Sequence, residues 1–431
     1  MLEMILGAPY IIRILSSLIV ILIINKVKDD LAISLLFGIA VLVLWTGHSL
    51  SAAAQISWHT FSSADNLALM LVIPQVIWLT SQMTATGAMK ELDEYIGSLV
   101  SRRNAMAIFP AVIGLLPMPG GAIFSAPLVD DCDSEKNIDP VLKTEINYWF
   151  RHIWEYWWPL YPGIILAIDI TGLPIASIML AQFPLCIASI FTGYFFLLRK
   201  VNINNDKNKS VEKARLPQIL KLVSPIIIII TVFALLKIFF SGISDYNKYL
   251  PMIAGIVTAQ IALQIQRPLD LKSWKKIIFT KSTMKFIFIV ALVNIYGAFI
   301  ESRLSDGTLL ISHLQSELFS LGIPVLLIIM LLPFIVGVTT GITICFVGAS
   351  FPIVVSLIGK DSGIGVILST AFIAYASGFM GVLLSPVHIC LVMTCGHFKT
   401  SVLKTIFKLI KPVSVMISFS VILYFIMIYF L

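Results

Sequence analysis

The sequence predicts an all-α polytopic membrane protein with about ten transmembrane helices, arranged as two inverted-topology repeats. Of the 431 residues, 58% are hydrophobic and 12% are charged, and the mean hydropathy is +0.96. Soluble domains carry about 25% charged residues, so this composition excludes a soluble globular protein. Two interrupted apolar stretches, Ala105–Pro127 and Pro333–Pro352, also hold matching places in the two halves of the chain.

The first repeat is predicted to cover residues 1–198. Its spans are expected at Leu6–Ile24, Leu31–Gly47, Leu67–Thr86, Ile146–Ile168 and Leu173–Leu198. Arg13 lies inside the first span, where it is expected to snorkel or to pair. Two mixed segments, Ser51–Ala64 and the charged Ala88–Arg103, are expected to lie in the membrane interface.

A re-entrant hairpin is predicted at residues 105–129, within AMAIFPAVIGLLPMPGGAIFSAP. Its centre, Pro117-Met118-Pro119-Gly120-Gly121, cannot continue a helix. The flanking arms, Met106–Leu116 and Ala122–Val129, are each roughly half as long as a ~30 Å hydrocarbon core requires. The alternative is a single span kinked at its prolines. The similar stretch in the second half favours the hairpin.

Residues 199–216 form the one long polar stretch and are predicted to be a cytoplasmic linker between the repeats. The second repeat, residues 217–431, contains a second re-entrant hairpin at residues 323–358. Arg267–Lys285 is a second basic amphipathic arm. The spans of this repeat are expected at Pro217–Phe240, Tyr249–Ile265, Phe286–Ile300, Ile364–Met393 and Pro412–Tyr429.

Short matches support the internal repeat. Phe109-Pro110 opens the first hairpin and Gly114 follows four residues after the proline, while Leu332-Pro333 and Gly337 have the same spacing in the second. In both halves a span interrupted by proline then follows. Because each unit has an odd number of spans, the two units face opposite ways, which is the plan of many secondary transporters.

Lysine and arginine indicate the orientation. Most of them fall in the linker, the amphipathic arms and the segment Gly396–Lys411, which the positive-inside rule assigns to the cytoplasm. Both termini are then extracytoplasmic, and the expected location is the cell (plasma) membrane. The net charge of +7 therefore reflects topology, and no nucleic-acid partner is expected.

Three motifs carry a resemblance to a known family: LPMPGGAIFSAPLVDD in the first hairpin, WFRHIWEYWWPLYPG in the fourth span and SGFMGVLLSPVH in the ninth. The sequence resembles an uncharacterised family of ten-span integral membrane proteins that is similar to the ion transporter superfamily, which includes gluconate, citrate and C4-dicarboxylate carriers. The resemblance implies two hairpins that meet at the midplane, a homodimer and elevator-type alternating access. A Ser-Asn-Thr tip motif is not found, so neither a dicarboxylate substrate nor sodium coupling is carried over.

The hairpin tips are predicted to bind a small anionic solute. Helix ends at mid-membrane offer free N–H groups to anions, and free carbonyls to Na⁺. Close helix packing by small residues is the alternative. The candidate substrate-binding residues of the two tips are Pro119, Gly120, Gly121, Ser125, Thr339, Thr340, Gly341 and Thr343.

Span four holds a concentration of ionisable side chains, with Arg151, His152 and Glu155 within five residues. Arg151 and Glu155 are expected to share one helical face, and Arg151 either anchors a substrate carboxylate or neutralises Glu155. His152 and Glu155 are the candidates for proton coupling. The matching part of span nine has no charge, with Ser385 as a binding candidate and His388 as a weaker one.

Other polar groups are interpreted as structural. The acidic run Asp130, Asp131 and Asp133 is expected to be a solvated helix end at the cytoplasmic mouth rather than a metal cluster. The five cysteines show no Cys/His metal spacing, so no metal site or disulfide is expected. No cofactor is expected, apart from Na⁺ as a possible coupling ion.

The predicted function is secondary active transport of a small organic or inorganic anion, coupled to H⁺ or Na⁺. An intramembrane enzyme is an alternative, but His152-Ile-Trp-Glu155 is HxxE and not the HExxH of zinc proteases, so no enzyme activity is expected. A structural or assembly membrane protein without transport is another alternative.

Overall fold

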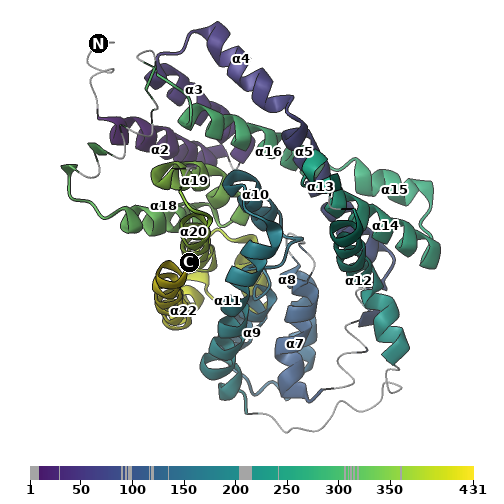
Figure 1. Ribbon diagram of the computed structural model, residues 1–431. Helices are drawn as coiled ribbons and strands as arrows, with labels where there is room; N and C mark the ends of the chain where they lie inside the picture. Colours follow the sequence, from purple (N-terminus) through teal and green to yellow (C-terminus); the bar gives the residue numbers. More distant parts are fainter. Residues whose placement is uncertain are drawn as a thin grey trace.

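The structure is a computed structural model that describes residues 9–28, 30–88, 91–92, 95, 100–115, 117, 121–133, 135–202, 216–240, 242–304, 307–308, 310, 313, 316–317, 320–359 and 362–431. The described chain is almost entirely helical (Figure 1). Seven of its helices are long and apolar enough to cross a membrane by length and composition. The chain is therefore an all-α polytopic membrane protein, as predicted.

One set of helices, here called the supporting group, comes from the first part of each half. It consists of α2 (Tyr10–Lys28), α3 (Leu31–Thr46), α4 (Leu50–Phe61), α5 (Ala64–Ala85), α12 (Leu216–Phe239), α13 (Gly242–Tyr246), α14 (Leu250–Gln266), α15 (Leu271–Ile278) and α16 (Lys281–Ile300). Several begin at side chains that accept a backbone N–H, such as Asp30, Ser63 and Thr280. Helix α15 carries the basic arm, and α16 begins five residues before the predicted span at Phe286.

The remaining helices, here called the hairpin group, come from the second part of each half. They are α7 (Arg102–Gly114), α8 (Ala122–Asp131), α9 (Pro140–Arg151), α10 (Pro162–Thr171) and α11 (Ile175–Phe196), then α18 (Val325–Thr340), α19 (Thr343–Ile358), α20 (Ile364–Leu383), α21 (Ile389–Phe398) and α22 (Val402–Phe430), with the short turn η1 (Leu198–Lys200). Figure 1 shows α12, α14 and α15 on the opposite side of the molecule from α22.

Both predicted hairpins are present as pairs of packed helices. Helices α7 and α8 pack on each other, and so do α18 and α19. The second hairpin turns at Gly341, which has a φ of 66°, a left-handed conformation that glycine adopts without strain. At the first tip, Pro119 and Gly120 lie outside the described residues.

Spans four and nine are each broken into two helices. Helix α9 ends at Arg151 and α10 begins at Pro162, while α20 ends at Leu383 and α21 begins at Ile389. The interruptions are here called break one (residues 152–161) and break two (residues 384–388). The expectation that Arg151 and Glu155 share a helical face was wrong, because the helix stops before Glu155.

The two hairpins pack on the broken spans in the same way. A Cβ added to Gly114 on α7 would collide with the main-chain oxygen of Arg151, and one added to Gly337 on α18 would collide with that of Gly378. These two glycines were paired by the predicted repeat, and each lets a hairpin arm approach the backbone of a broken span. The boundaries of the repeats themselves stay a prediction.

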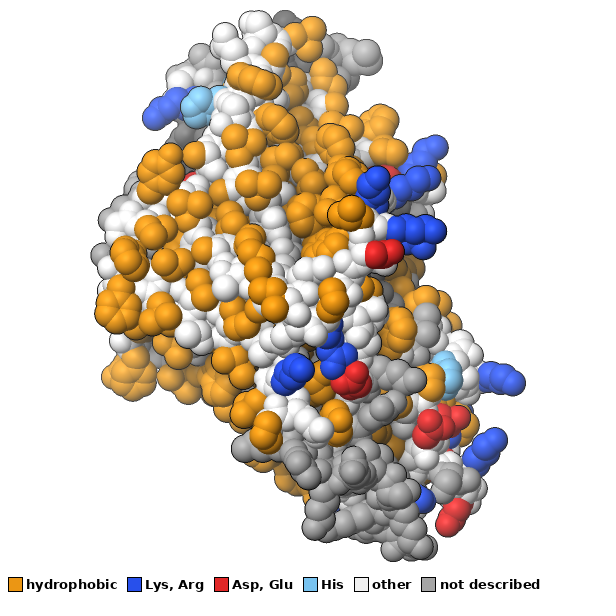
Figure 2. Space-filling model, turned by 90° about the vertical axis from the view of Figure 1, so that its right-hand side faces the viewer, with side chains coloured by type: hydrophobic (Ala, Val, Ile, Leu, Met, Phe, Trp, Pro, Cys, Tyr) orange, Lys and Arg blue, Asp and Glu red, His pale blue; other side chains and the backbone are white. Residues whose placement is uncertain are grey.

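The outer surface fits a bilayer. In the view of Figure 2 hydrophobic side chains cover much of the face, and the charged ones stand in small groups, most of them at the right-hand side and in the lower half. Helices such as α2, α12 and α22 leave large apolar side chains exposed, among them Ile23, Ile238 and Phe425. Such apolar surfaces can face the hydrocarbon chains of lipids without the free-energy cost of exposing them to water.

Candidate functional site

A cavity of about 260 Å³ lies where the two hairpin tips and the two breaks meet. The hairpin group supplies most of its wall, and Ile77 of α5 and Phe286 of α16 close it from the supporting group. The hairpin-group residues that line it are Pro117, Arg151, Glu155, Tyr161, Pro162, Gly341, Ile342, Thr343, Ile344, His388, Ile389 and Cys390.

Arg151 occupies the first-hairpin side of the cavity. It is the last residue of α9 and is 2% exposed. Its guanidinium lies against Gly121, so close that a Cβ at that position would collide with it. Gly121 is the residue just before α8, so the positive side chain stands at the start of the returning arm of the first hairpin.

Break one is fixed to the first hairpin by two hydrogen bonds. The Tyr161 hydroxyl donates to the main-chain oxygen of Gly114 at 2.5 Å, and the Trp154 indole N–H donates to that of Ala111 at 2.6 Å. Both acceptors are on α7. These two side chains anchor break one to the neighbouring arm, while turns such as that from the Glu155 N–H to the His152 oxygen satisfy part of its unwound backbone, as a membrane interior requires.

Break two is fixed to the second hairpin in a similar way. Nδ1 of His388 lies 2.5 Å from the main-chain oxygen of Gly341 at the hairpin tip. A Cβ at Gly341 would lie 2.9 Å from the backbone of His388, so only glycine allows this approach. The hairpin tip, break two and the cavity are therefore in direct contact.

The two breaks also contact each other. Nε2 of His152 lies 3.0 Å from Nε2 of His388 and 3.7 Å from Oε1 of Glu155. The Tyr148 hydroxyl on α9 donates to the main-chain oxygen of Leu383, and the Tyr375 hydroxyl on α20 donates to that of Glu155. Each broken span thus holds the break of the other.

The structure places only part of the predicted site in this cavity. Arg151, Glu155, Gly341 and Thr343 line it, and His152 contacts Glu155 from behind the wall. Ser125, Thr340 and Ser385 are buried without lining it, and Ser125 and Thr340 donate to their own helices, at Ala122 and Val336. Thr339 is exposed and donates to Ile335. Solute binding by any of these residues stays a prediction.

Sequence reasoning missed three residues of the site. Cys390 lines the cavity beside His388, although the cysteines were expected to be small core residues. Tyr161, within break one, bonds to α7, and Tyr375 of α20 bonds to Glu155, so both tyrosines anchor break one. The one sequence signal for Cys390 was its place in His388-Ile389-Cys390, which puts two metal-binding side chains near the proline-broken span.

Of the acidic run after the first hairpin, Asp131 is exposed as a solvated helix end predicts, whereas Asp130 and the buried Asp133 pair with Lys143. Lys143 Nζ lies 2.6 Å from Asp130 Oδ1 and 3.1 Å from Asp133 Oδ2, and the Asp133 side chain is fully buried. Asp133 also accepts the backbone N–H groups of Asn137 and Ile138. Through these bonds the carboxylates of Asp130 and Asp133 fix the segment between α8 and α9.

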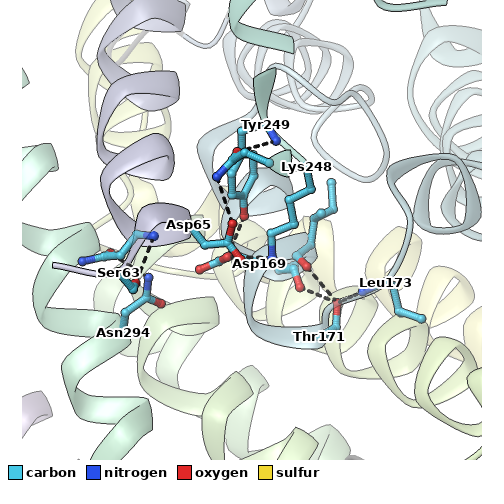
Figure 3. A network of polar contacts seen from close by, with 12 residues as sticks. Ser63, Asp65, Asp169, Thr171, Leu173, Lys248, Tyr249 and Asn294 are labelled. Atoms are coloured by element: carbon cyan, nitrogen blue, oxygen red, sulfur yellow. Dashed lines mark hydrogen bonds and ion pairs between the residues drawn. The ribbon is translucent and has the colours of Figure 1, made fainter. Parts of the chain in front are cut away.

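A second cavity of about 270 Å³ is polar and lies between the supporting group and α10 (Figure 3). In it, Asp169 of α10 accepts a hydrogen bond from the Tyr249 hydroxyl at 2.6 Å and pairs with Lys248 at 3.0 Å. Asp65 of α5 accepts from the Asn247 amide at 3.0 Å. These contacts tie the far end of broken span four to the start of α14.

Outside the spans, Arg267 after α14 pairs with Glu91 after α5. The Arg267 guanidinium donates to both carboxylate oxygens, at 2.8 and 2.5 Å, and also to the main-chain oxygen of Thr86. Hydrogen bonds from this guanidinium lower the pKa of Glu91 below its ordinary value. The pair joins the ends of two supporting helices, one from each half of the chain.

Comparison with known proteins identifies the family. The family model described as "Protein of unknown function (DUF401)" matches residues 11–427. The uncharacterized membrane protein YhfA of Bacillus subtilis (strain 168) is 24% identical over 188 residues, which cover 40% of this chain and 40% of that protein's length. Because the family model covers nearly the whole sequence, the chain belongs to the DUF401 family.

Proposed function

We propose that the protein is a secondary active transporter of a small organic or inorganic anion, with the cavity at the two breaks as its binding site. The observation that carries this proposal is the meeting of two hairpin tips and two broken spans around one cavity that contains a buried arginine. Secondary transporters bind their substrates near mid-membrane between discontinuous helices of this kind.

The electrostatics of the cavity support an anionic solute. Three helices begin in its wall, because Pro162, Thr343 and Ile389 are the first residues of α10, α19 and α21. Free N–H groups and the helix dipole make each start favourable for negative charge. Arg151 adds a full positive charge on the side of the first hairpin. A carboxylate or phosphate-type group fits this environment.

The position of the cavity supports alternating access. It lies between the hairpin group and the supporting helices α5 and α16. The reciprocal bonds of Tyr148 and Tyr375 hold the two broken spans together, so they would move as one unit past the supporting group. The elevator motion and the homodimer that the resemblance to the ion transporter superfamily implies are part of this proposal.

Proton or sodium coupling is part of the same proposal. Glu155 and His152 are the candidates for binding H⁺, whereas Na⁺ would use the main-chain oxygens at the breaks. The proposed location is the plasma membrane with both termini outside. A cysteine substituted for Lys248 should then label from outside, and one substituted for Lys276 only from the cytoplasm.

A two-stage experiment tests the proposal. Purified protein is screened by thermal shift against organic and inorganic anions, with and without Na⁺ and across pH. The anions that stabilise it are then offered to proteoliposomes under a pH or Na⁺ gradient. The expected result is uptake of a stabilising anion that depends on one gradient. Failure of every anion to stabilise the protein or to be taken up would instead favour the structural alternative.

A further inference from the structure

Three side chains with metal-binding atoms meet at the wall of the cavity. They are His152 from break one, His388 from break two and Cys390 from the first turn of α21, and all three are buried. Their ligand atoms lie within 4.8 Å of one another, and among the described residues this is the group of three whose atoms are placed to hold one ion. Glu155 adds a carboxylate oxygen 3.7 Å from Nε2 of His152.

The hydrogen bonds of the two histidines determine which of their nitrogens can bind a metal. Nδ1 of His152 lies 2.5 Å from the main-chain oxygen of Tyr148, and Nδ1 of His388 lies 2.5 Å from that of Gly341. A carbonyl oxygen only accepts, so both Nδ1 atoms carry the hydrogen. In neutral imidazoles both Nε2 atoms then present lone pairs, and these face each other at 3.0 Å. Two lone pairs at this distance repel each other unless a proton or a metal ion lies between or beside them.

The spacing of these atoms is close to that of the ligands of a transition metal ion. Tetrahedral zinc has metal–nitrogen distances near 2.0 Å and metal–sulfur distances near 2.3 Å, which place its ligand atoms roughly 3.3–3.5 Å apart. The nitrogen–nitrogen and nitrogen–oxygen separations of 3.0 and 3.7 Å lie on either side of that range, and the three side chains, whose ligand atoms lie within 4.8 Å of one another, would draw closer together around the ion. Metal-binding histidines also usually donate their other N–H to a carbonyl or carboxylate, as both histidines do here.

We propose that His152 Nε2, His388 Nε2 and Cys390 Sγ bind a divalent transition metal ion of the zinc type, with the carboxylate of Glu155 as the fourth ligand. The sulfur and imidazole ligands select such an ion over Mg²⁺, Ca²⁺ or Na⁺. On binding, the Cys390 thiol releases its proton to solvent as the sulfur–metal bond forms. Thiolate and carboxylate together then balance the charge of the ion.

The ion would reach this site through the cavity, since Glu155, His388 and Cys390 all line it. One histidine comes from each half of the chain, so the ion would cross-link the two breaks. This role goes beyond anion transport, and the site can be tested by binding alone. Transport can therefore fail while metal binding succeeds, or the reverse.

Cobalt is the probe for the test. Purified full-length protein in detergent is stripped with a chelator and titrated with Co²⁺, whose bond to a thiolate gives a charge-transfer absorption in the near ultraviolet. We expect this absorption to saturate at one ion per chain, with release of protons, and to disappear when Zn²⁺ displaces the cobalt. Absence of the absorption in the unaltered protein overturns the proposal and indicates that the two histidines share a proton instead.

Matched variants locate the ligands. Cys390→Ser should abolish the charge-transfer absorption, whereas Cys395→Ser, at a buried cysteine on the same helix, should leave it unchanged. His152→Gln and His388→Gln should each weaken binding by at least about tenfold, and His397→Gln, at an exposed histidine, should not. Retention of the absorption in Cys390→Ser, or equal losses in the ligand and control variants, would assign the cobalt to another site.

Discussion

The two breaks have the same place in the fold but different chemistry. Break one spans residues 152–161, follows Arg151 and carries Glu155 and three tryptophans, whereas break two spans residues 384–388 and has no charged side chain other than His388 when protonated. Break one is held to the hairpin arm α7 by side chains, and break two is held to the tip of the other hairpin by His388. The hairpins and breaks of the two halves therefore form a symmetric frame around the site, whereas the charge of the site comes almost entirely from one half.

This asymmetry has a physical reason. Ionised groups inside a membrane are costly, so a site needs few of them, and they can come from one half as long as the other supplies the geometry. Here the second half contributes helix starts, the left-handed Gly341 and a histidine. Solute recognition should therefore depend strongly on break one, and the packing of the two breaks should be equally sensitive in both halves.

The largest expected effect is at Arg151. Arg151→Gln removes the full positive charge from the cavity, and loss of one partner of a buried ionic contact costs at least about 2 kcal/mol, or about 30-fold in solute affinity. Isothermal titration with the anion found in the thermal-shift screen measures this loss. The matched control is Arg13→Gln, a buried arginine on α2 that donates to Trp45 and stacks on Tyr10. Equal losses in the two variants would remove Arg151 from the solute site.

The next effect tests the symmetry of the frame. Gly114→Val and Gly337→Val each push a side chain against the main-chain oxygen of a broken span. Overpacking of this kind costs about 1–3 kcal/mol, and we expect the two variants to lose similar amounts of thermal stability in detergent. Gly396→Val, where a Cβ meets nothing within 4 Å, is the control. A loss confined to one variant would show that the two hairpins do not pack equivalently.

A smaller effect is expected at Glu155. If protons drive transport, Glu155→Gln should lower pH-driven uptake by about tenfold or more while solute exchange without a gradient continues. Uptake is measured in chelator-treated proteoliposomes, so that loss of a metal ligand does not contribute. Glu91→Gln, which removes a carboxylate outside the spans, is the control. Normal pH-driven uptake by the Gln variant would leave Glu155 as a structural partner of His152.

Much of this fold follows from sequence because helix-breaking residues mark it. The second hairpin was predicted at residues 323–358, and its arms run from Val325 to Ile358. In span four the sequence predicts an interruption by proline, and its prolines are Pro159 and Pro162, but the helix already ends at Arg151. No proline or glycine marks residues 152–158, because tertiary bonds from Trp154 and Tyr375 stabilise the unwound backbone there.

The metal-binding group shows a different limit of prediction from sequence. Motif searches use short spacings along the chain, whereas His152 and His388 come from opposite halves of the sequence. Their contact depends on two helix breaks that meet in space, and only one of those breaks carries ionisable residues that attract attention. Cys390 could therefore be recognised as part of the site only once the structure had placed the two breaks against each other.

The smallest expected effect lies away from both breaks and provides a reference for them. Hydrogen bonds from the Arg267 guanidinium lower the pKa of Glu91 from its ordinary value. The ionised pair therefore stabilises the fold above that ordinary pKa, and its contribution is lost as pH falls through the lowered pKa. The Glu91 side chain is 45% exposed, so solvent screens the pair and Glu91→Gln should cost only about 0–1 kcal/mol at pH 7. Thermal melting of Glu91→Gln and unaltered protein at pH 7 and at pH 4 measures the difference, which should shrink at the lower pH and in high salt. A difference that grows on acidification would contradict this sign and assign the acid sensitivity of the fold to another carboxylate.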